Sequence, residues 1–559
     1  MIERYDVPAP RPLPAGSLRS RRELLRLGAG AAVALLLVRC GDGGDEPIAV
    51  ATEEPSGALA LAQWPLPPTA PRAGRIRLGV LGVHDPTDYA LPAEALPLVY
   101  ACLVAVDPRD GAVYADLASE VELDVEALTL RFRLPPTLRF HPDRDGLSEA
   151  LTAESVRLDF ERRRAAREFL FTEVVDSVEA PTLDELVLRL RAPFSLLFEY
   201  LGDPARAGVR QDARYATHDA RRGSGPFMPV SREAGGDLLV AHPLHHRAPL
   251  PRLDSVALLR VDNEAVRADA FARGGLDLLP GGSPQAGPAR SDAHLVERPS
   301  RRMRGLGLSL LSEKGGVPVR WVEAFQDTRV RRAVSHALDR DALAAAGDGA
   351  LSGPVGPAWG ADALSAETLA RHPLLAFDPP AARALLAEAG HEGLAFRLEA
   401  PALDGMRELA QLVLAQLERA GFRPQLTVRD PVEWRRSFLA GDFEATLFEL
   451  EAIDTPELGL RLHTSEGAES RFSPWGYSSP PFDAAVRRVL AEITPAGRAR
   501  RSREAQQLLL EQVPAMFPLL APYERAELAP NVEGYEWGGY EFNERHLAAL
   551  WGVGAQPSA

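Results

Sequence analysis

Two periodicities alternate along this chain. Short segments with apolar residues at every second position, or in brief runs, predict strands, whereas apolar residues repeated at helical spacing predict helices. The clearest strand patterns are 76–83, 128–134, 185–192 and 254–261, and the clearest helix patterns are 153–169 and 503–513. Strand and helix patterns are interspersed and no internal repeat is visible, so the sequence predicts an α/β fold.

The segment 327–343, DTRVRRAVSHALDRDAL, has the most regular helical pattern. Asp327 and Thr328 supply side-chain oxygens for capping the first turn, and apolar residues follow at helical spacing. They are Val330, Ala333, Val334, Ala337, Leu338 and Leu343. By itself the pattern predicts a surface helix.

The first 40 residues have the order of an export signal. Residues 20–26, SRRELLR, form a twin-arginine pattern, and an apolar run follows over 27–38. This run is shorter than the roughly 20 residues of a membrane span, so residues 1–39 predict a signal peptide of the Tat type. The alternative is an amphipathic start to an ordinary domain. Cys40 follows LVR as in a lipobox, although a small residue is usual before the lipidated cysteine, so both lipidation of Cys40 and its absence stay open.

The mature chain is expected to start with a tether. Residues 40–74 are rich in Gly, Pro, Ala and acidic residues and have no sustained period, which is typical of a flexible linker. No other run reaches 18 apolar residues, so we expect no membrane span after the signal peptide.

Composition and charge narrow the class of protein. A chain of 559 residues, 46% hydrophobic and 25% charged, is typical of a globular protein with two or three domains. Its two cysteines exclude a disulfide framework, and Cys102 is expected to be a buried thiol. Removing residues 1–39, with seven arginines and three acidic residues, changes the formal net charge from −15 to −19. This acidic balance disfavours nucleic acid and anionic lipid surfaces as partners.

The helix pattern at 327–343 resembles the signature D-x-x-V-R-x-A-[IVL]-x-x-A-[IVLM]-D-R-x-x-[LI] of the family 5 extracellular solute-binding proteins. This family comprises oligopeptide, dipeptide and nickel-binding receptors of ABC importers. Other segments resemble family motifs in the order that the family requires. They are VDPRDGAVYADLAS at 106–119, LTLRFRLPPTLRF at 128–140, LTAESV at 151–156, GSGPF at 223–227, FARGGLD at 271–277, AARALLAEAG at 381–390 and GYSSPPFD at 476–483.

The resemblance implies a two-lobe fold of the periplasmic-binding-protein kind (type II, similar to cluster C), with an extra subdomain in the first lobe. The implied ranges are 75–103, 201–299 and 520–559 for the core of lobe I, 104–200 for the extra subdomain and 300–519 for lobe II. The chain is then expected to cross between the lobes near 299–305 and again near 519–523. Ligand is expected between the lobes, which close by hinge motion.

The function implied by the resemblance is capture of a peptide or a similar small solute outside the cytoplasm and its delivery to the permease of an ABC importer. Such a protein is monomeric, needs no cofactor and catalyses no reaction. Peptide is the first expectation for the ligand, although the family also binds nickel complexes, haem, opines and oligosaccharides, and fold alone does not choose among them.

The resemblance also points to the acidic stretch after Gly441, DFEATLFELEAIDTPE. A strand there places Glu449 and Glu451 on one face, and a turn through Asp454 and Thr455 follows. Peptide-binding relatives have an Asp here that pairs with the α-amino group of the ligand, and Asp454 matches it if one residue is inserted. Asp454, with Glu451 nearby, can hold an ammonium through charge-assisted hydrogen bonds. The alternative is a solvated acidic turn.

Four aromatic residues and one arginine complete the candidate ligand contacts. Trp359 lies in the loop GPVGPAWGA, Tyr89 follows the first predicted strand, and Trp475 and Tyr477 lie in the motif near the end of the chain. In relatives these neighbourhoods line the cleft, whereas the alternative for each ring is packing in the core. Arg304, near the first crossing, can meet a ligand carboxylate or form a salt bridge between the lobes.

An enzyme is the rival class. The segment around Ser224 is not a G-x-S-x-G elbow, and neither S-x-x-K, H-E-x-x-H nor a phosphate-binding G-x-x-x-x-G-K occurs. His242, His245 and His246 could bind a metal, but adjacent residues of an extended strand point to opposite faces. A sensor or co-receptor without transport, and a secreted hydrolase as the weaker case, therefore remain the alternatives to a transport receptor.

Overall fold

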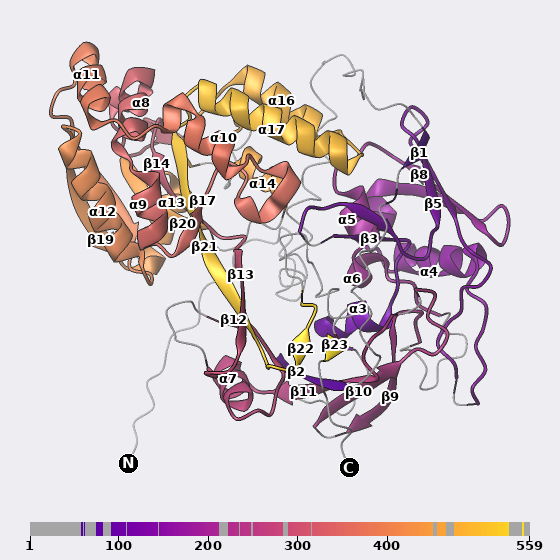
Figure 1. Ribbon diagram of the computed structural model, residues 1–559. Helices are drawn as coiled ribbons and strands as arrows, with labels where there is room; N and C mark the ends of the chain where they lie inside the picture. Colours follow the sequence, from indigo (N-terminus) through magenta and orange to yellow (C-terminus); the bar gives the residue numbers. More distant parts are fainter. Residues whose placement is uncertain are drawn as a thin grey trace, which may run out of the picture.

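The computed structural model describes residues 57–59, 61, 74–81, 91–107, 109–143, 145–211, 222–233, 235–247, 250–282, 289–314, 316–450, 455–465, 474–535 and 551–552. The predicted signal peptide and Cys40 lie outside these residues, and so does most of the predicted tether. Strands and helices are mixed along the described chain, as the alternating periodicities predicted (Figure 1). Within the described residues, no helix combines the length and the apolar character that crossing a membrane requires.

One series of paired strands runs through both lobes. In order across the sheet it contains β19 (Arg423–Arg429), β18 (Ala395–Pro401), β20 (Ala445–Leu450), β14 (Met303–Leu308), β21 (Met516–Leu528), β12 (Leu278–Gly282), β2 (Arg75–Leu81), β11 (Ser255–Val261), β10 (Gly236–Ala241) and β9 (Phe227–Glu233). Two further strands, β13 (His294–Pro299) and β17 (Gly349–Leu351), also pair with β21. β21 is therefore the centre of the series.

The long strand β21 belongs to both lobes. Leu520 of β21 lies opposite Arg304 of β14, and Tyr523 lies opposite Pro299 of β13. The chain thus passes between the two parts once between β13 and β14 and once within β21. In Figure 1, β21 is the long yellow strand that runs from the helices of lobe II down to the sheet of lobe I. Two extended segments, side by side, join the lobes.

Lobe I is built around β2 and its neighbours. β2 and β11 are parallel, whereas β11, β10 and β9 pair antiparallel. Ile76, Leu78 and Val80 of β2 are buried, so the alternating pattern of this strand faces the core as predicted. The other elements are η1 (Ala93–Ala95), α3 (Leu96–Val99), α7 (Glu264–Ala272), β22 (Val532–Glu533) and β23 (Trp551–Gly552).

A separate antiparallel sheet forms the extra subdomain, shown in indigo and purple in Figure 1. Its strand order is β1 (Gly57–Leu59), β5 (Glu120–Asp124), β6 (Thr129–Arg133), β8 (Glu185–Leu190) and β7 (Val175–Glu179). Around it lie β3 (Val104–Val106), β4 (Val113–Ala115), α4 (Ala153–Ala165), the π-helix η2 (Leu170–Val174), α5 (Leu197–Leu201) and α6 (Pro204–Ala207). The helix predicted over 153–169 ends early, and Arg167 takes a left-handed backbone conformation with φ of 60°. This subdomain has its own apolar core, and Cys102 beside it is buried as predicted.

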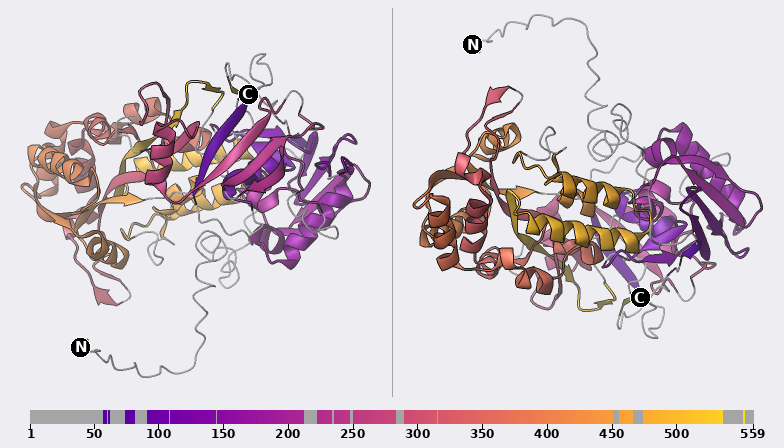
Figure 2. Two further views of the ribbon diagram at one scale, coloured as in Figure 1. Left: turned by 90° about the horizontal axis from the view of Figure 1, so that it is seen from below. Right: turned by 90° about the horizontal axis from the view of Figure 1, so that it is seen from above.

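Helices surround the remaining strands in lobe II. They are α8 (Thr328–Ala337), α9 (Arg340–Ala346), α10 (Ala366–Arg371), α11 (Pro379–Ala389), α12 (Met406–Arg419), α13 (Pro431–Ala440), α14 (Pro456–Arg461), α16 (Pro480–Leu490) and α17 (Pro495–Glu511), with the 3-10 helices η4 (Glu323–Gln326), η5 (Pro357–Asp362) and η6 (Pro373–Leu375). A small hairpin, β15 (Glu313–Lys314) with β16 (Val317–Pro318), projects from this lobe (Figure 2).

The helix predicted over 327–343 is two helices, α8 and α9. Asp327 caps α8 as predicted, because its side chain accepts a hydrogen bond from the Arg329 N–H at 2.8 Å. Leu338 leaves the helical conformation with φ −96° and ψ 112°, and the Asp339 side chain caps α9 by accepting from the Ala342 N–H at 3.1 Å. All six apolar residues of the pattern are fully buried on both sides of the break, so their spacing gave no sign of it.

Candidate functional site

The structure joins two predicted ligand contacts to each other. Glu449 on β20 lies opposite Arg304 on β14, and Arg304 Nε donates to Glu449 Oε2 at 2.6 Å. Arg304 also donates to the carbonyl of Asp404 at 3.0 Å. The side chains of Arg304 and Glu449 are only 8% and 9% exposed, so this is a buried ion pair. Since both strands lie in lobe II, it is not the salt bridge between lobes that the sequence left open.

Arg302 is the more accessible neighbour of this ion pair. Its Nη1 lies 3.5 Å from Glu449 Oε1, at the limit of a hydrogen bond, and its side chain is 37% exposed. Arg302 precedes Arg304 by two positions at the crossing between the lobes, so both side chains lie on the same face of the extended chain. Two guanidinium groups share one carboxylate here. Of these two guanidinium groups, that of Arg302 is the more exposed to solvent.

The acidic turn after β20 is only partly described. Glu451 and Asp454 lie outside the described residues, so their part in ligand binding stays a prediction. Thr455 is described and partly buried; it precedes α14 at the N-cap position, and its side chain makes no capping hydrogen bond. The strand itself, β20, lies where the alternating pattern after Gly441 predicted it.

Trp475 and Tyr477 pack inside lobe II in this structure. Trp475 is fully buried, its indole N–H donates to the carbonyl of Leu462 at 3.0 Å, and its ring centroid is 5.2 Å from that of Phe448. Tyr477 is also buried, and its hydroxyl donates to Gln512 Oε1 at 3.5 Å. Burial raises the pKa of Tyr477. In this conformation both rings have the packing role that the sequence gave as the alternative.

Of the two remaining aromatic candidates, the structure describes Trp359 and does not describe Tyr89. Trp359, on η5, is 1% exposed, and the guanidinium of Arg301 lies 5.2 Å from its ring centroid. This geometry is a cation–π contact at the crossing between the lobes. Tyr89 lies outside the described residues. A ligand role for either aromatic residue stays a prediction.

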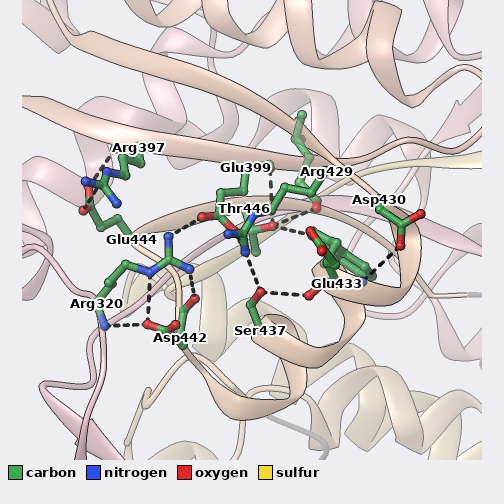
Figure 3. Close-up of polar contacts among 12 residues, drawn as sticks. Arg320, Arg397, Glu399, Arg429, Asp430, Glu433, Ser437, Asp442, Glu444 and Thr446 are labelled. Carbon is green, nitrogen blue, oxygen red and sulfur yellow. Dashed lines mark hydrogen bonds and ion pairs between the residues drawn. The ribbon is translucent and has the colours of Figure 1, made fainter.

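A charged network that the sequence analysis did not single out lies beside β18–β20 (Figure 3). Arg320 follows the β15–β16 hairpin and donates to Asp442 Oδ1 at 3.0 Å and to Glu399, which is 2% exposed. Arg429 Nη1 donates to Ser437 Oγ at 2.7 Å and lies 3.4 Å from Glu399. Although burial favours its neutral form, hydrogen bonds from Arg320 keep the pKa of Asp442 below its usual value. The charges of Arg320 and Arg429 balance those of Asp442 and Glu399. Their hydrogen bonds connect α13 with β18 and β19.

Histidines fasten the extra subdomain to lobe I. His141 Nδ1 accepts from the Gly223 N–H at 3.2 Å, and its Nε2 lies 3.0 Å from the carbonyl of Gly225, so Nε2 carries the proton. His242 Nδ1 lies 3.3 Å from the same carbonyl, and the two rings are 4.8 Å apart. Burial lowers the pKa of His141 to about 3 and that of His242 to about 4. Both rings are therefore neutral, structural groups near pH 7.

The histidines considered for a metal site make other contacts. His246 Nε2 lies 3.1 Å from Asp116 Oδ1, and the rings of His245 and His246 meet at 4.5 Å. In the part of the chain that the structure describes, no three His, Cys, Asp or Glu side chains are grouped so that they could hold a metal ion.

Comparisons with known proteins agree with this architecture. Residues 112–462 match the bacterial extracellular solute-binding proteins, family 5 (middle). The glutathione-binding protein GsiB of Pectobacterium atrosepticum is 25% identical over 446 residues, which cover 73% of this chain and 80% of GsiB. Among solved structures, HbpA2 from Haemophilus parasuis has a TM-score of 0.67 at 16% identity and covers 86% of this chain and 100% of its own. The periplasmic protein DppA from Helicobacter pylori, in complex with the peptide STSA, has a TM-score of 0.53 at 17% identity and covers 86% of this chain and 98% of its own.

The structural likeness confirms the predicted two-lobe fold of the periplasmic binding proteins. The relatives are binding proteins, not enzymes. The family match extends over more than half of the chain and includes both the predicted signature helix and β20. The chain therefore belongs to the bacterial extracellular solute-binding proteins of family 5.

Proposed function

We propose that this protein captures short peptides outside the cytoplasmic membrane, with glutathione as the first ligand to test, and passes them to the permease of an importer. The observation that carries the proposal is the strand β21, which pairs with β14 in one lobe and with β13 in the other. Two lobes between which the described chain crosses in adjacent extended segments can rotate about these segments and enclose a ligand. An interface between domains is also where small-molecule sites concentrate.

The charges near the crossing support a peptide-like ligand. Arg302 offers a partly exposed guanidinium beside a buried ion pair, and a carboxylate matches its planar donors. The acidic residues of 451–454 follow directly after β20 and supply oxygens for an ammonium. Glutathione and short peptides carry both groups. The name of the GsiB relative states glutathione binding, and the DppA structure contains a peptide.

Calorimetric titration tests the ligand class. Glutathione, a second tripeptide and the N-acetylated form of each should be titrated into the purified protein. A ligand at a hundredfold excess over its Kd should raise the free energy of unfolding by about 2.7 kcal/mol. The free amines are expected to bind and the acetylated forms to bind poorly. If neither glutathione nor short peptides bind, while native mass spectrometry shows a sugar or a metal complex co-purifying, the peptide proposal is wrong.

Export and partners complete the proposal. Residues 1–39 are proposed as a Tat signal peptide, Cys40 as the site of lipid anchoring to the outer face of the membrane, and the mature protein as a monomer that contacts permease subunits. Twin arginines followed by a short apolar run and a lipobox-like cysteine support the first two points.

A further inference from the structure

Lobe II touches the extra subdomain at a point away from the two crossings. Helices α16 and α17 lie side by side and extend from lobe II to the subdomain, as the right view of Figure 2 shows. The start of α17 meets the segment of the subdomain that leads into α5. Ile493, in the turn between α16 and α17, is fully buried and packs in the apolar core of the subdomain. In return, Val106 of the subdomain packs in an apolar cluster of lobe II.

Arg498 is the centre of this contact. It is 1% exposed. Within lobe II its Nε and Nη2 donate to the two oxygens of Asp362, each at 3.0 Å. Across the contact its Nη1 lies 2.5 Å from Glu199 Oε1 and donates to the carbonyl of Ser195 at 2.8 Å. Beside it the Ser195 hydroxyl donates to Glu457 Oε1 of α14 at 2.5 Å.

Separating lobe II from the subdomain breaks some of these bonds and leaves others intact. Asp362 and Arg498 both belong to lobe II and form a bidentate ion pair, which stays intact when the subdomain moves away. Nη1 of Arg498 loses Glu199 and the Ser195 carbonyl, and Glu457 loses the Ser195 hydroxyl. Removing one member of a buried ion pair normally leaves an uncompensated charge, which is strongly unfavourable. Here Arg498 keeps Asp362, whereas the buried Glu199 carboxylate loses the ion pair with Arg498, so this ion pair favours the docked form.

The subdomain is attached to lobe I in a different way. Main-chain hydrogen bonds join Leu117 to Cys102 at 2.9 Å and Ala118 to Leu103 at 3.0 Å, and the His141 N–H donates to the Gly223 carbonyl at 2.8 Å. Among the described residues, by contrast, no hydrogen bond between main-chain groups connects the subdomain with lobe II. The subdomain therefore moves with lobe I, and side chains alone hold it to lobe II.

We propose that Arg498 is a reversible latch. It pairs with Glu199 and with the carbonyl of Ser195, which holds lobe II against the subdomain, and it releases both groups when the lobes separate. The proposal rests on the two-lobe binding function above. A latch of this kind sets the balance between docked and separated lobes before ligand arrives. Because a ligand enclosed between lobes binds the docked form, that balance scales its apparent affinity.

Distances between spin labels test the latch in the protein without ligand. Leu183 of the subdomain is 70% exposed and the Arg371 side chain of lobe II is 78% exposed, so Leu183→Cys with Arg371→Cys places one label on each body. The chain has two cysteines; Cys102 is buried and Cys40→Ala removes the other. In this background Glu199→Gln keeps the shape of the side chain and removes the charge that Arg498 grips.

The ratio of docked to separated forms is expected to fall about tenfold or more in Glu199→Gln, because the buried ion pair between Arg498 and Glu199 is lost. Ser195→Ala keeps the carbonyl that Arg498 contacts but removes the hydroxyl that donates to Glu457, so it should shift the ratio in the same direction through the loss of that second bond. Asp159→Asn is the matched control, because Asp159 is a buried acid that pairs with Arg163 of the subdomain at 3.2 Å and accepts from the Arg210 N–H of lobe I at 3.3 Å, and neither partner belongs to lobe II. It should leave the distances unchanged.

Distance distributions in Glu199→Gln and Ser195→Ala that equal the wild-type distribution overturn the latch. An equal shift in Asp159→Asn also overturns it, since loosening the subdomain alone would then explain the result. Titration of the wild type with glutathione is a separate readout: a protein that binds no peptide, yet separates its lobes in Glu199→Gln, refutes the proposed ligand and supports the latch.

Discussion

Acid should weaken this fold through the histidines between the extra subdomain and lobe I. His141 accepts from Gly223 through Nδ1 and is buried against His242. A proton on Nδ1 would turn this acceptor into a donor facing another N–H, and it would place a charge in a buried site next to a second ring. Burial therefore disfavours the imidazolium, and the pKa of His141 falls from 6.5 to about 3.

The size of the effect follows from the difference in proton binding. In the unfolded chain His141 titrates near 6.5 and in the folded protein near 3, so its contribution to stability is complete above pH 6.5 and is lost as the pH falls towards 3. At pH 5 the loss is about 2 kcal/mol. His242, with a pKa lowered to about 4, adds a similar amount. This loss is a large share of the 5 to 15 kcal/mol, roughly, that holds a typical domain folded.

Urea unfolding at pH 7.5 and pH 5, followed by circular dichroism, measures this loss. His141→Gln keeps a donor and an acceptor but cannot titrate, so its free energy of unfolding should fall about 2 kcal/mol less than that of the wild type between the two pH values. His294 is exposed on β13, which makes His294→Gln the control. An equal loss in wild type and His141→Gln would refute the argument from burial, even if the variant is less stable at both pH values.

Other predictions address export, the ion pair and the ligand. Replacing both Arg21 and Arg22 with lysine should leave unprocessed precursor in the cytoplasm, and normal processing would contradict the Tat signal. Cys40→Ala should release the protein from membranes, and unchanged membrane association in fractionation would contradict the lipid anchor. Glu449→Gln should lower the free energy of unfolding by about 2 to 4 kcal/mol, because Arg304 loses its charged partner; an unchanged urea midpoint argues against it. Asp454→Asn should weaken binding of a free-amine peptide by about 2 to 5 kcal/mol in calorimetry with little effect on folding, and unchanged affinity makes Asp454 a surface turn residue.

Local patterns were sufficient for the strands and most helices. The alternating residues of β2, β6, β8 and β11 appear in the structure within a few positions of their predicted limits, because one face of each strand is buried. The local pattern did not predict the break between α8 and α9, because burial does not change at the break. Leu338 stays buried although it leaves the helix, and the groups that stabilise the break include Gln416, whose side chain accepts from the Asp339 N–H at 2.9 Å. A partner 77 positions away has no trace in the local pattern.

Contacts between distant residues also decide the candidate site, and local sequence patterns do not show them. The sequence analysis named Glu449 and Arg304 separately, Glu449 as a candidate in the acidic stretch and Arg304 as a residue for a ligand carboxylate or a salt bridge between the lobes. Whether two such residues bind ligand or each other depends on whether β14 and β20 are neighbours in the sheet, and strand order is decided by contacts across 145 positions of sequence. Trp475 is a similar case. Its ring fits against Gly307, where a Cβ would lie 1.9 Å from a ring atom, so the glycine on β14 makes room for the tryptophan.

The pairing of Glu449 changes where a ligand's charges should be met. A carboxylate already held by Arg304, with Arg302 beside it, cannot serve an ammonium without leaving two guanidinium groups uncompensated, which costs more than the new contact returns. If the ligand is a peptide, the proposal therefore assigns its ammonium to the acidic residues that follow β20 in the sequence and its carboxylate to Arg302. On this proposal a carboxylate at Arg302 binds beside the crossing between the lobes, so binding is expected to be coupled to closure.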